Sequence, residues 1–189
     1  MNHSRLFRRA FAIVFTILFA QGAIARQPAD ASIYELDSKW RDKAGHQVKL
    51  SELAGKVRVV AMGYTSCQYA CPRIMADMRA IERALPKELV GKVAFTFISF
   101  DPKRDTPEHL RDFQKKNDID AWTFLTGNDD DVLELSVALG IKFQKTGDTD
   151  FAHSNTIFVL SSDGRIIHRQ DTLGTAPEGA IKAVMKALR

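Results

Sequence analysis

The sequence predicts an α/β domain in which a mixed central sheet is flanked by helices. The chain has 189 residues, enough for one domain with a hydrophobic core. Apolar, β-branched runs alternate along it with segments of helical periodicity, which is the pattern of strands connected by helices. Near the C-terminus, the turn Ser162-Asp163-Gly164 separates two short strand-like runs and predicts an antiparallel hairpin. Helix-connected strands and a terminal hairpin together give a sheet of mixed direction.

An N-terminal β-hairpin is the first element that we expect. The segments 34–40 and 47–50, on either side of a turn at 42–45, alternate in polarity, as the strands of a half-buried hairpin do. The later elements that we expect are, in order, a helical turn capped by Ser51, a strand at 57–62, a helix at 72–85, a strand at 93–100, a helix with Thr106 as N-cap and Pro107 at its first position, a strand at 122–125, a helix at 129–139, a strand at 156–160, its hairpin partner at 165–168 and a last helix at 176–188.

The only two cysteines, Cys67 and Cys71, lie on the turn between the first buried strand and its helix. In an open α/β sheet that turn lies at the carboxyl end of the strand, where ligands gather. We predict Pro72 as the first helical residue and Cys71 as the N-cap, where the helix dipole would lower the pKa of its thiol. A structural disulfide is the alternative, but such bridges usually close longer loops. The spacing favours a redox or metal-binding dithiol, and a dithiol on this turn favours a thioredoxin-like fold.

The first 25 residues have the organisation of a secretory signal peptide. Three arginines precede an apolar run at 10–20, and Ala23-Ile24-Ala25 supplies an A-x-A cleavage motif. We therefore expect a signal peptide at 1–25, a short linker at 26–33 and the thioredoxin-like domain at 34–189. The expected location is the periplasm, and the alternative is anchoring to the inner membrane by an uncleaved N-terminal segment.

Export has consequences for charge and for the thiols. The signal peptide holds three arginines and no acid, so its removal lowers the net charge from +4 to +1. No dense basic patch remains, which argues against a nucleic-acid partner. An oxidising compartment closes an unprotected dithiol into a disulfide. A pair that must stay reduced there needs a metal or a periplasmic thiol reductant.

A third metal ligand is best sought among the histidines, because two thiols supply at most two ligands. His153 stands just before the strand expected at 156–160, and in a thioredoxin-like fold this loop packs beside the cysteine turn. It is the best candidate in the chain. His3 belongs to the signal peptide and His46 to the hairpin turn. His109 is interpreted as a solvated helix residue and His168 as a strand residue.

Three blocks of the sequence resemble the Sco/SenC family, whose members are copper-binding, thioredoxin-like proteins linked to assembly of cytochrome c oxidase. They are C-x-x-x-C-P at 67–72, D-P-x-R-D-T-P at 101–107, and His153-Ser154 before the strand at 157–160. The resemblance implies that Cys67, Cys71 and His153 bind copper, as Cu(I) or Cu(II). Soft thiolates select Cu(I), and imidazole suits either ion. Asp101 ends its strand beside the cysteine turn and is a candidate to orient a ligand, although a well-capped connection explains the same block without a function.

The resemblance implies a metallochaperone that delivers copper to a client cuproprotein such as a subunit of cytochrome c oxidase. A thiol–disulfide oxidoreductase acting on protein cysteines is the alternative, so enzymatic activity is left open. A peroxidase is a weaker third hypothesis, because the usual proline upstream of the cysteine is absent. Gln68 and Ala152 depart from residues common in the family, and neither departure removes a ligand.

Overall fold

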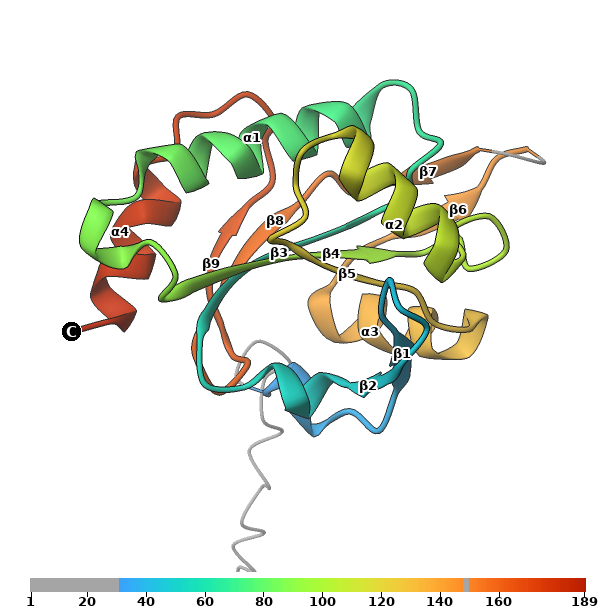
Figure 1. Ribbon diagram of the computed structural model, residues 1–189, viewed down its shortest axis with the longest axis horizontal. Coiled ribbons are helices and arrows are strands. Elements are labelled where there is room, and N and C mark those ends of the chain that lie inside the picture. The colour runs from blue at the N-terminus through green and yellow to red at the C-terminus, as the bar shows by residue number, and fades with distance from the viewer. Residues whose placement is uncertain (1–30, 148–149) are drawn as a thin grey trace, which may run out of the picture.

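A computed structural model describes residues 31–147 and 150–189 (Figure 1). The predicted signal peptide at 1–25 and most of the predicted linker at 26–33 lie outside these residues. In the described ranges, no helix has the length and apolar character needed to cross a membrane.

The central sheet has five strands in the order β5-β4-β3-β8-β9. They are β3 (Val57–Gly63), β4 (Val93–Ser99), β5 (Thr123–Leu125), β8 (Ile157–Leu160) and β9 (Ile166–Gln170). The first three are parallel, β8 runs antiparallel to β3, and β9 runs antiparallel to β8. The mixed sheet and its terminal hairpin are therefore confirmed.

Helices cover both faces of this sheet (Figure 1). One face carries α1 (Ala70–Ala84), α2 (Pro107–Lys116) and α4 (Glu178–Ala187). The other carries α3 (Asp129–Leu139) and the N-terminal hairpin of β1 (Lys39–Arg41) and β2 (Gln47–Lys49). All seven residues of β3 are buried, as expected for a central strand covered on both sides.

The two faces of β3 belong to separate parts of the core. Val59 packs with Ile74 of α1, whereas Val60 belongs to the cluster that includes Trp40 of the hairpin and Leu135 of α3. Because consecutive residues of a strand point to opposite faces, one apolar run fills both layers. The cysteine turn therefore directly follows a strand whose residues are all buried.

Short 3-10 turns complete the chain, and two of them differ from expectation: one occupies the start of the strand expected at 34–40, and another has a cap residue other than Ser51. The 3-10 turns are η2 (Ile33–Glu35), η3 (Leu50–Leu53) and η4 (Lys87–Leu89). Ser51 lies inside η3 and does not cap it, so that prediction was wrong. Lys49 is the cap residue, and its backbone N–H donates to Glu52 Oε1 at 2.8 Å.

A small two-stranded sheet follows α3 and was not predicted. It consists of β6 (Phe143–Lys145) and β7 (Phe151–His153), paired antiparallel with Phe143 opposite His153. Figure 1 shows this hairpin beyond the ends of the central strands, on the side where α1 begins. It places His153 at the end of a strand instead of in a loop.

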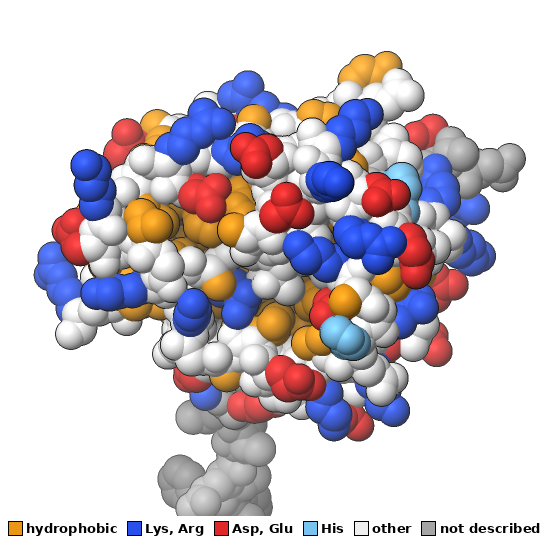
Figure 2. Space-filling view, in the orientation of Figure 1, with side chains coloured by type: hydrophobic (Ala, Val, Ile, Leu, Met, Phe, Trp, Pro, Cys, Tyr) orange, Lys and Arg blue, Asp and Glu red, His pale blue; other side chains and the backbone are white. Residues whose placement is uncertain are grey.

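Charged residues do not segregate by sign on the face that Figure 2 shows. Lysine and arginine side chains are interspersed there with aspartate and glutamate. This face therefore carries no extended surface of a single charge sign.

Candidate metal centre

Helix α1 begins two residues earlier than predicted, and this exchanges the roles of the two thiols. Its N-cap is Tyr69 and its first residue is Ala70, so Cys71 lies within the first turn. Pro72 is still accommodated, because the first N–H groups of a helix have no partner within it. The sulfur that caps the helix belongs to Cys67, whose Sγ accepts the N–H of Cys71 at 3.4 Å. The prediction of Cys71 as N-cap was wrong.

The two thiols have opposite electrostatic environments. Burial acts against the thiolate of Cys67, but the N–H groups at the start of α1 outweigh it and lower the pKa of this thiol. Burial raises the pKa of Cys71, which is only 3 % exposed and accepts the N–H of Tyr64 at 3.4 Å. The thiol with the lowered pKa is therefore Cys67, contrary to expectation. Both cysteines are free thiols in this structure.

The structure brings His153 to the dithiol. One ligand atom each of Cys67, Cys71 and His153 lie within 4.8 Å of one another. His153 Nδ1 lies 3.0 Å from the carbonyl oxygen of Ser154, and a carbonyl can only accept, so Nδ1 carries the hydrogen. This leaves Nε2 with the lone pair that a metal ligand requires. Burial lowers the pKa of His153, opposed by the bond to Ser154, which favours the neutral ring.

An aromatic cluster fixes the imidazole of His153. The ring meets Tyr64 and Phe100 edge-on, with centroid distances of 5.9 Å and 4.9 Å. Phe143 stacks on Phe100 at 5.4 Å, and Phe151 meets the same ring edge-on at 5.3 Å. The backbone N–H of Phe151 also donates to Tyr64 Oη at 3.4 Å. These contacts attach the hairpin that carries His153 to the segment that carries the cysteines.

Gly63, the last residue of β3, makes room for the sulfur of Cys71. A Cβ atom at this position would lie 2.9 Å from Cys71 Sγ and 2.7 Å from Phe97 Cζ. Both distances are shorter than ordinary carbon contacts, so the close packing of the thiol against the end of β3 requires glycine here.

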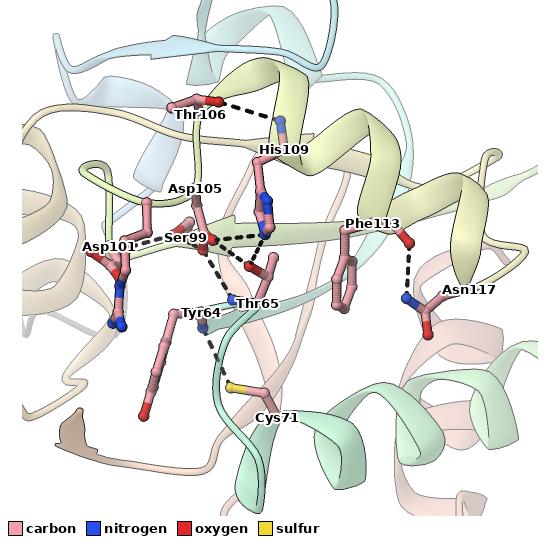
Figure 3. A network of polar contacts seen from close by, with 11 residues as sticks. Tyr64, Thr65, Cys71, Ser99, Asp101, Asp105, Thr106, His109, Phe113 and Asn117 are labelled. Carbon is pink, nitrogen blue, oxygen red and sulfur yellow. Dashed lines mark hydrogen bonds and ion pairs between the residues drawn. The ribbon is translucent and has the colours of Figure 1, made fainter. Parts of the chain in front are cut away.

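Next to the cysteine turn, the carboxylate of Asp105 accepts three hydrogen bonds (Figure 3). It accepts the backbone N–H of Thr65 at 3.0 Å, the hydroxyl of Ser99 at 2.5 Å and the hydroxyl of Thr65. Burial raises the pKa of Asp105, and the bonds from Ser99 and Thr65 oppose that shift. His109 Nε2 lies 2.8 Å from Thr65 Oγ1. The network ties the loop after β4 to the turn after β3.

This network bears on two interpretations. His109 is exposed, as the sequence predicts for a solvated helix residue, and its ring also contacts Thr65. Asp105 belongs to the block at 101–107 that a well-capped connection explains, yet its carboxylate is the one that contacts the cysteine turn. Asp101 instead pairs with Arg104, and its N–H donates to Ser99 Oγ at 2.9 Å. An orienting role for Asp101 stays a prediction.

Two histidines that the sequence analysis did not choose as ligands lie apart from the three-residue cluster. His46 lies in the turn before β2, 3.4 Å from Asp42, and His168 lies on β9. In the described ranges, the only group of three or more possible ligands is Cys67, Cys71 and His153. His3 lies outside these ranges.

The fold and the cluster define a thioredoxin-like protein with a soft-metal or redox site, since two thiolates and one imidazole suit copper and thiol exchange alike. A model of the SCO1/SenC family matches residues 28–189. The chain belongs to the SCO1/SenC family.

Individual relatives agree with this assignment. The SCO1 protein homolog of Bacillus subtilis (strain 168) is 25 % identical over 181 residues, which cover 93 % of this chain and 92 % of the homolog. The structure of Bradyrhizobium japonicum ScoI with copper bound is 25 % identical with a TM-score of 0.68, covering 79 % of this chain and 96 % of ScoI. BsSco, described as a member of the Sco family of cytochrome c oxidase assembly proteins, shares the fold with a TM-score of 0.69 at 22 % identity, covering 84 % and 95 %.

Proposed function

We propose that this protein binds copper through Cys67, Cys71 and His153. The observation that carries the proposal is the convergence of these three side chains within 4.8 Å. The donor set fits the ion, because thiolates select Cu(I) and a neutral imidazole nitrogen binds both Cu(I) and Cu(II). The copper-bound structure of Bradyrhizobium japonicum ScoI supports it.

The residues around the ligands prepare them for the ion. The N–H groups at the start of α1 favour the thiolate of Cys67, and the carbonyl of Ser154 fixes the tautomer of His153. Tyr64 and Phe100 restrict the imidazole ring. Three protein ligands leave an ion accessible to a partner, unlike the four that close a structural site.

Delivery is the second part of the proposal. We propose that copper passes to a client cuproprotein of the respiratory chain, with a cytochrome c oxidase subunit as the favoured client. Membership of the Sco family supports this, because the family is linked to assembly of that enzyme. A periplasmic thiol reductant would keep the dithiol able to load.

Location can be tested separately. We propose export with cleavage after Ala25, motivated by the A-x-A motif that follows a short apolar run. Protein recovered from the periplasm should then begin at Arg26 or within a residue or two. An intact mass that retains Met1 in a membrane fraction would favour an uncleaved anchor instead.

The decisive experiment titrates reduced variants with each copper ion. His153→Ala should lose Cu(II) binding more strongly than Cu(I) binding, because the thiolates that remain still suit Cu(I). Cys67→Ser and Cys71→Ser should each abolish tight binding of both ions and prevent the intramolecular disulfide. His168→Ala, a histidine outside the cluster, is the matched control and should bind like the parent.

The alternative function is thiol–disulfide exchange with protein cysteines. Two free thiols on the first strand-to-helix turn, one with a lowered pKa, favour such chemistry by themselves. If His153→Ala binds both copper ions as the parent does, the imidazole is structural and this alternative takes precedence.

A further inference from the structure

A groove of about 380 Å³ lies beside the dithiol, between α1 and α2. Cys71, Met75 and Arg79 line it from α1 at intervals of four residues, so they share one face of that helix. Phe113 of α2 and Asn117, the C-cap residue of that helix, line the opposite side, again four residues apart. Figure 3 shows Phe113 extending from α2 toward the α1 side. The groove is therefore largely apolar. It lies between two helices and begins at the thiols.

Arg79 is the one arginine among the residues that line this groove, and no acidic group in the described residues pairs with its charge. The side chain is half-buried. Among the residues that the structure describes, no hydrogen bond or ion pair joins it to another group, whereas Arg73 on the same helix pairs with Asp77 at 3.3 Å. A partly desolvated guanidinium is complementary to a carboxylate, which it can bind through two parallel hydrogen bonds.

We propose that this groove docks an extended segment of the client protein that carries a cysteine, an apolar side chain and an acid. The inference rests on the proposed function, in which the thiols act on a client. The cysteine would meet the dithiol, the apolar side chain would lie against Met75 and Phe113, and the acid would pair with Arg79.

The spacing of the client's residues follows from the helix. Cys71 and Arg79 are eight residues apart, which corresponds to about 12 Å along an α-helix. An extended chain advances about 3.3 Å per residue, so the acid belongs about three or four residues from the cysteine.

Disulfide exchange with a model peptide reports this docking. The Cys67 thiolate attacks a peptide disulfide, forms a mixed disulfide and releases one peptide thiolate, which takes up a proton. Cys71 then loses its proton and attacks the mixed disulfide at Cys67, releasing the second peptide thiol. The protein dithiol loses two electrons and two protons, and the peptide disulfide gains them.

The probe is a symmetric peptide disulfide with leucine beside each cysteine and glutamate four residues away, together with a matched peptide carrying lysine for glutamate. At low ionic strength, Arg79→Glu should slow exchange with the glutamate peptide by about fivefold and speed exchange with the lysine peptide by a similar factor. Arg83→Glu changes the net charge equally but lies outside the groove, so it should show no such reversal of preference. Phe113→Ala should slow both peptides.

Two controls separate the possible failures. Exchange with 2,2′-dithiodipyridine, a small neutral disulfide, should proceed equally in the parent and both arginine variants, because it needs no docking. Copper titration of Arg79→Glu should match the parent. If Arg79→Glu and Arg83→Glu show the same exchange rates with the glutamate peptide and the same rates with the lysine peptide, the docking inference is wrong while the copper proposal stands. If the parent itself binds no copper, the proposed function fails irrespective of the peptide result.

Discussion

The carboxylate of Asp105 accepts the backbone N–H of Thr65 at 3.0 Å across 40 residues of sequence. Thr65 lies two residues before Cys67, and Asp105 lies just before α2, so the bond joins the turns that follow two neighbouring parallel strands. The geometry of the dithiol therefore depends on a buried carboxylate that does not itself belong to the ligand cluster.

Removal of that carboxylate should be costly. Asp105→Ala leaves the backbone N–H of Thr65 and the buried hydroxyl of Ser99 without their acceptor, and we expect a loss of about 2–4 kcal/mol in the free energy of unfolding. Urea unfolding of the reduced, metal-free protein measures it. Asp112→Ala, at an exposed position on α2, should change stability by less than about 0.5 kcal/mol. Equal effects of the two substitutions would show that the network contributes little.

The same carboxylate predicts a pH dependence. Because burial raises the pKa of Asp105 in the folded state, its contribution to stability is fully present below the ordinary aspartate value of about 3.9 and is lost as pH rises through the folded pKa. The unfolding free energy of the parent minus that of Asp105→Asn should therefore be largest at the acid end of a titration and fall as pH increases. A difference that grows with pH would contradict the raised pKa.

Gly63→Ala tests the packing of Cys71 against β3. The new Cβ would lie 2.9 Å from Cys71 Sγ, so either the sulfur or the strand must move, at a cost of about 1–3 kcal/mol. We expect weaker Cu(I) binding as well as lower stability. Gly147→Ala is the control, since a Cβ there meets nothing within 4 Å. Unchanged Cu(I) affinity in Gly63→Ala would mean that the thiol tolerates the shift.

The two thiols should differ in reactivity. Cys67 has the lowered pKa, whereas Cys71 is more deeply buried and has a raised pKa. In metal-free protein near neutral pH, iodoacetamide should modify Cys71→Ser, which retains Cys67, about tenfold faster or more than it modifies Cys67→Ser. Mass spectrometry over time gives both rates. The reverse order would restore Cys71 as the thiol with the lowered pKa, as the sequence predicted.

The predictable parts of this protein are those with strong local signals. The β-branched run of β3, the Asp-Gly turn after β8 and the Thr106-Pro107 start of α2 each carry a local signal, and each element lies where the sequence placed it. Cys67, Cys71 and His153 were found as candidates because few residue types can serve as soft ligands and this chain holds few of them.

The parts that escaped prediction depend on distant contacts. The strands β6 and β7 have three residues each, and they are held by ring contacts to Tyr64 and Phe100 that no local pattern reveals. The start of α1 moved because a sulfur, that of Cys67, accepts the bond that a helix cap usually takes with oxygen. Asp105 had a sufficient local explanation, which concealed its bond to Thr65.

The attachment of the β6–β7 hairpin has a kinetic consequence. This hairpin is a separate two-stranded sheet, and such a sheet has little stability of its own. Its aromatic contacts are thus the main restraint on the imidazole, while both sulfurs belong to a turn anchored by the central strand. Local opening of the hairpin would withdraw His153, the third ligand of the proposed copper site, and leave the five-stranded sheet intact. In the proposed site, release of copper by the imidazole and unfolding of the domain would therefore be separate events with separate barriers.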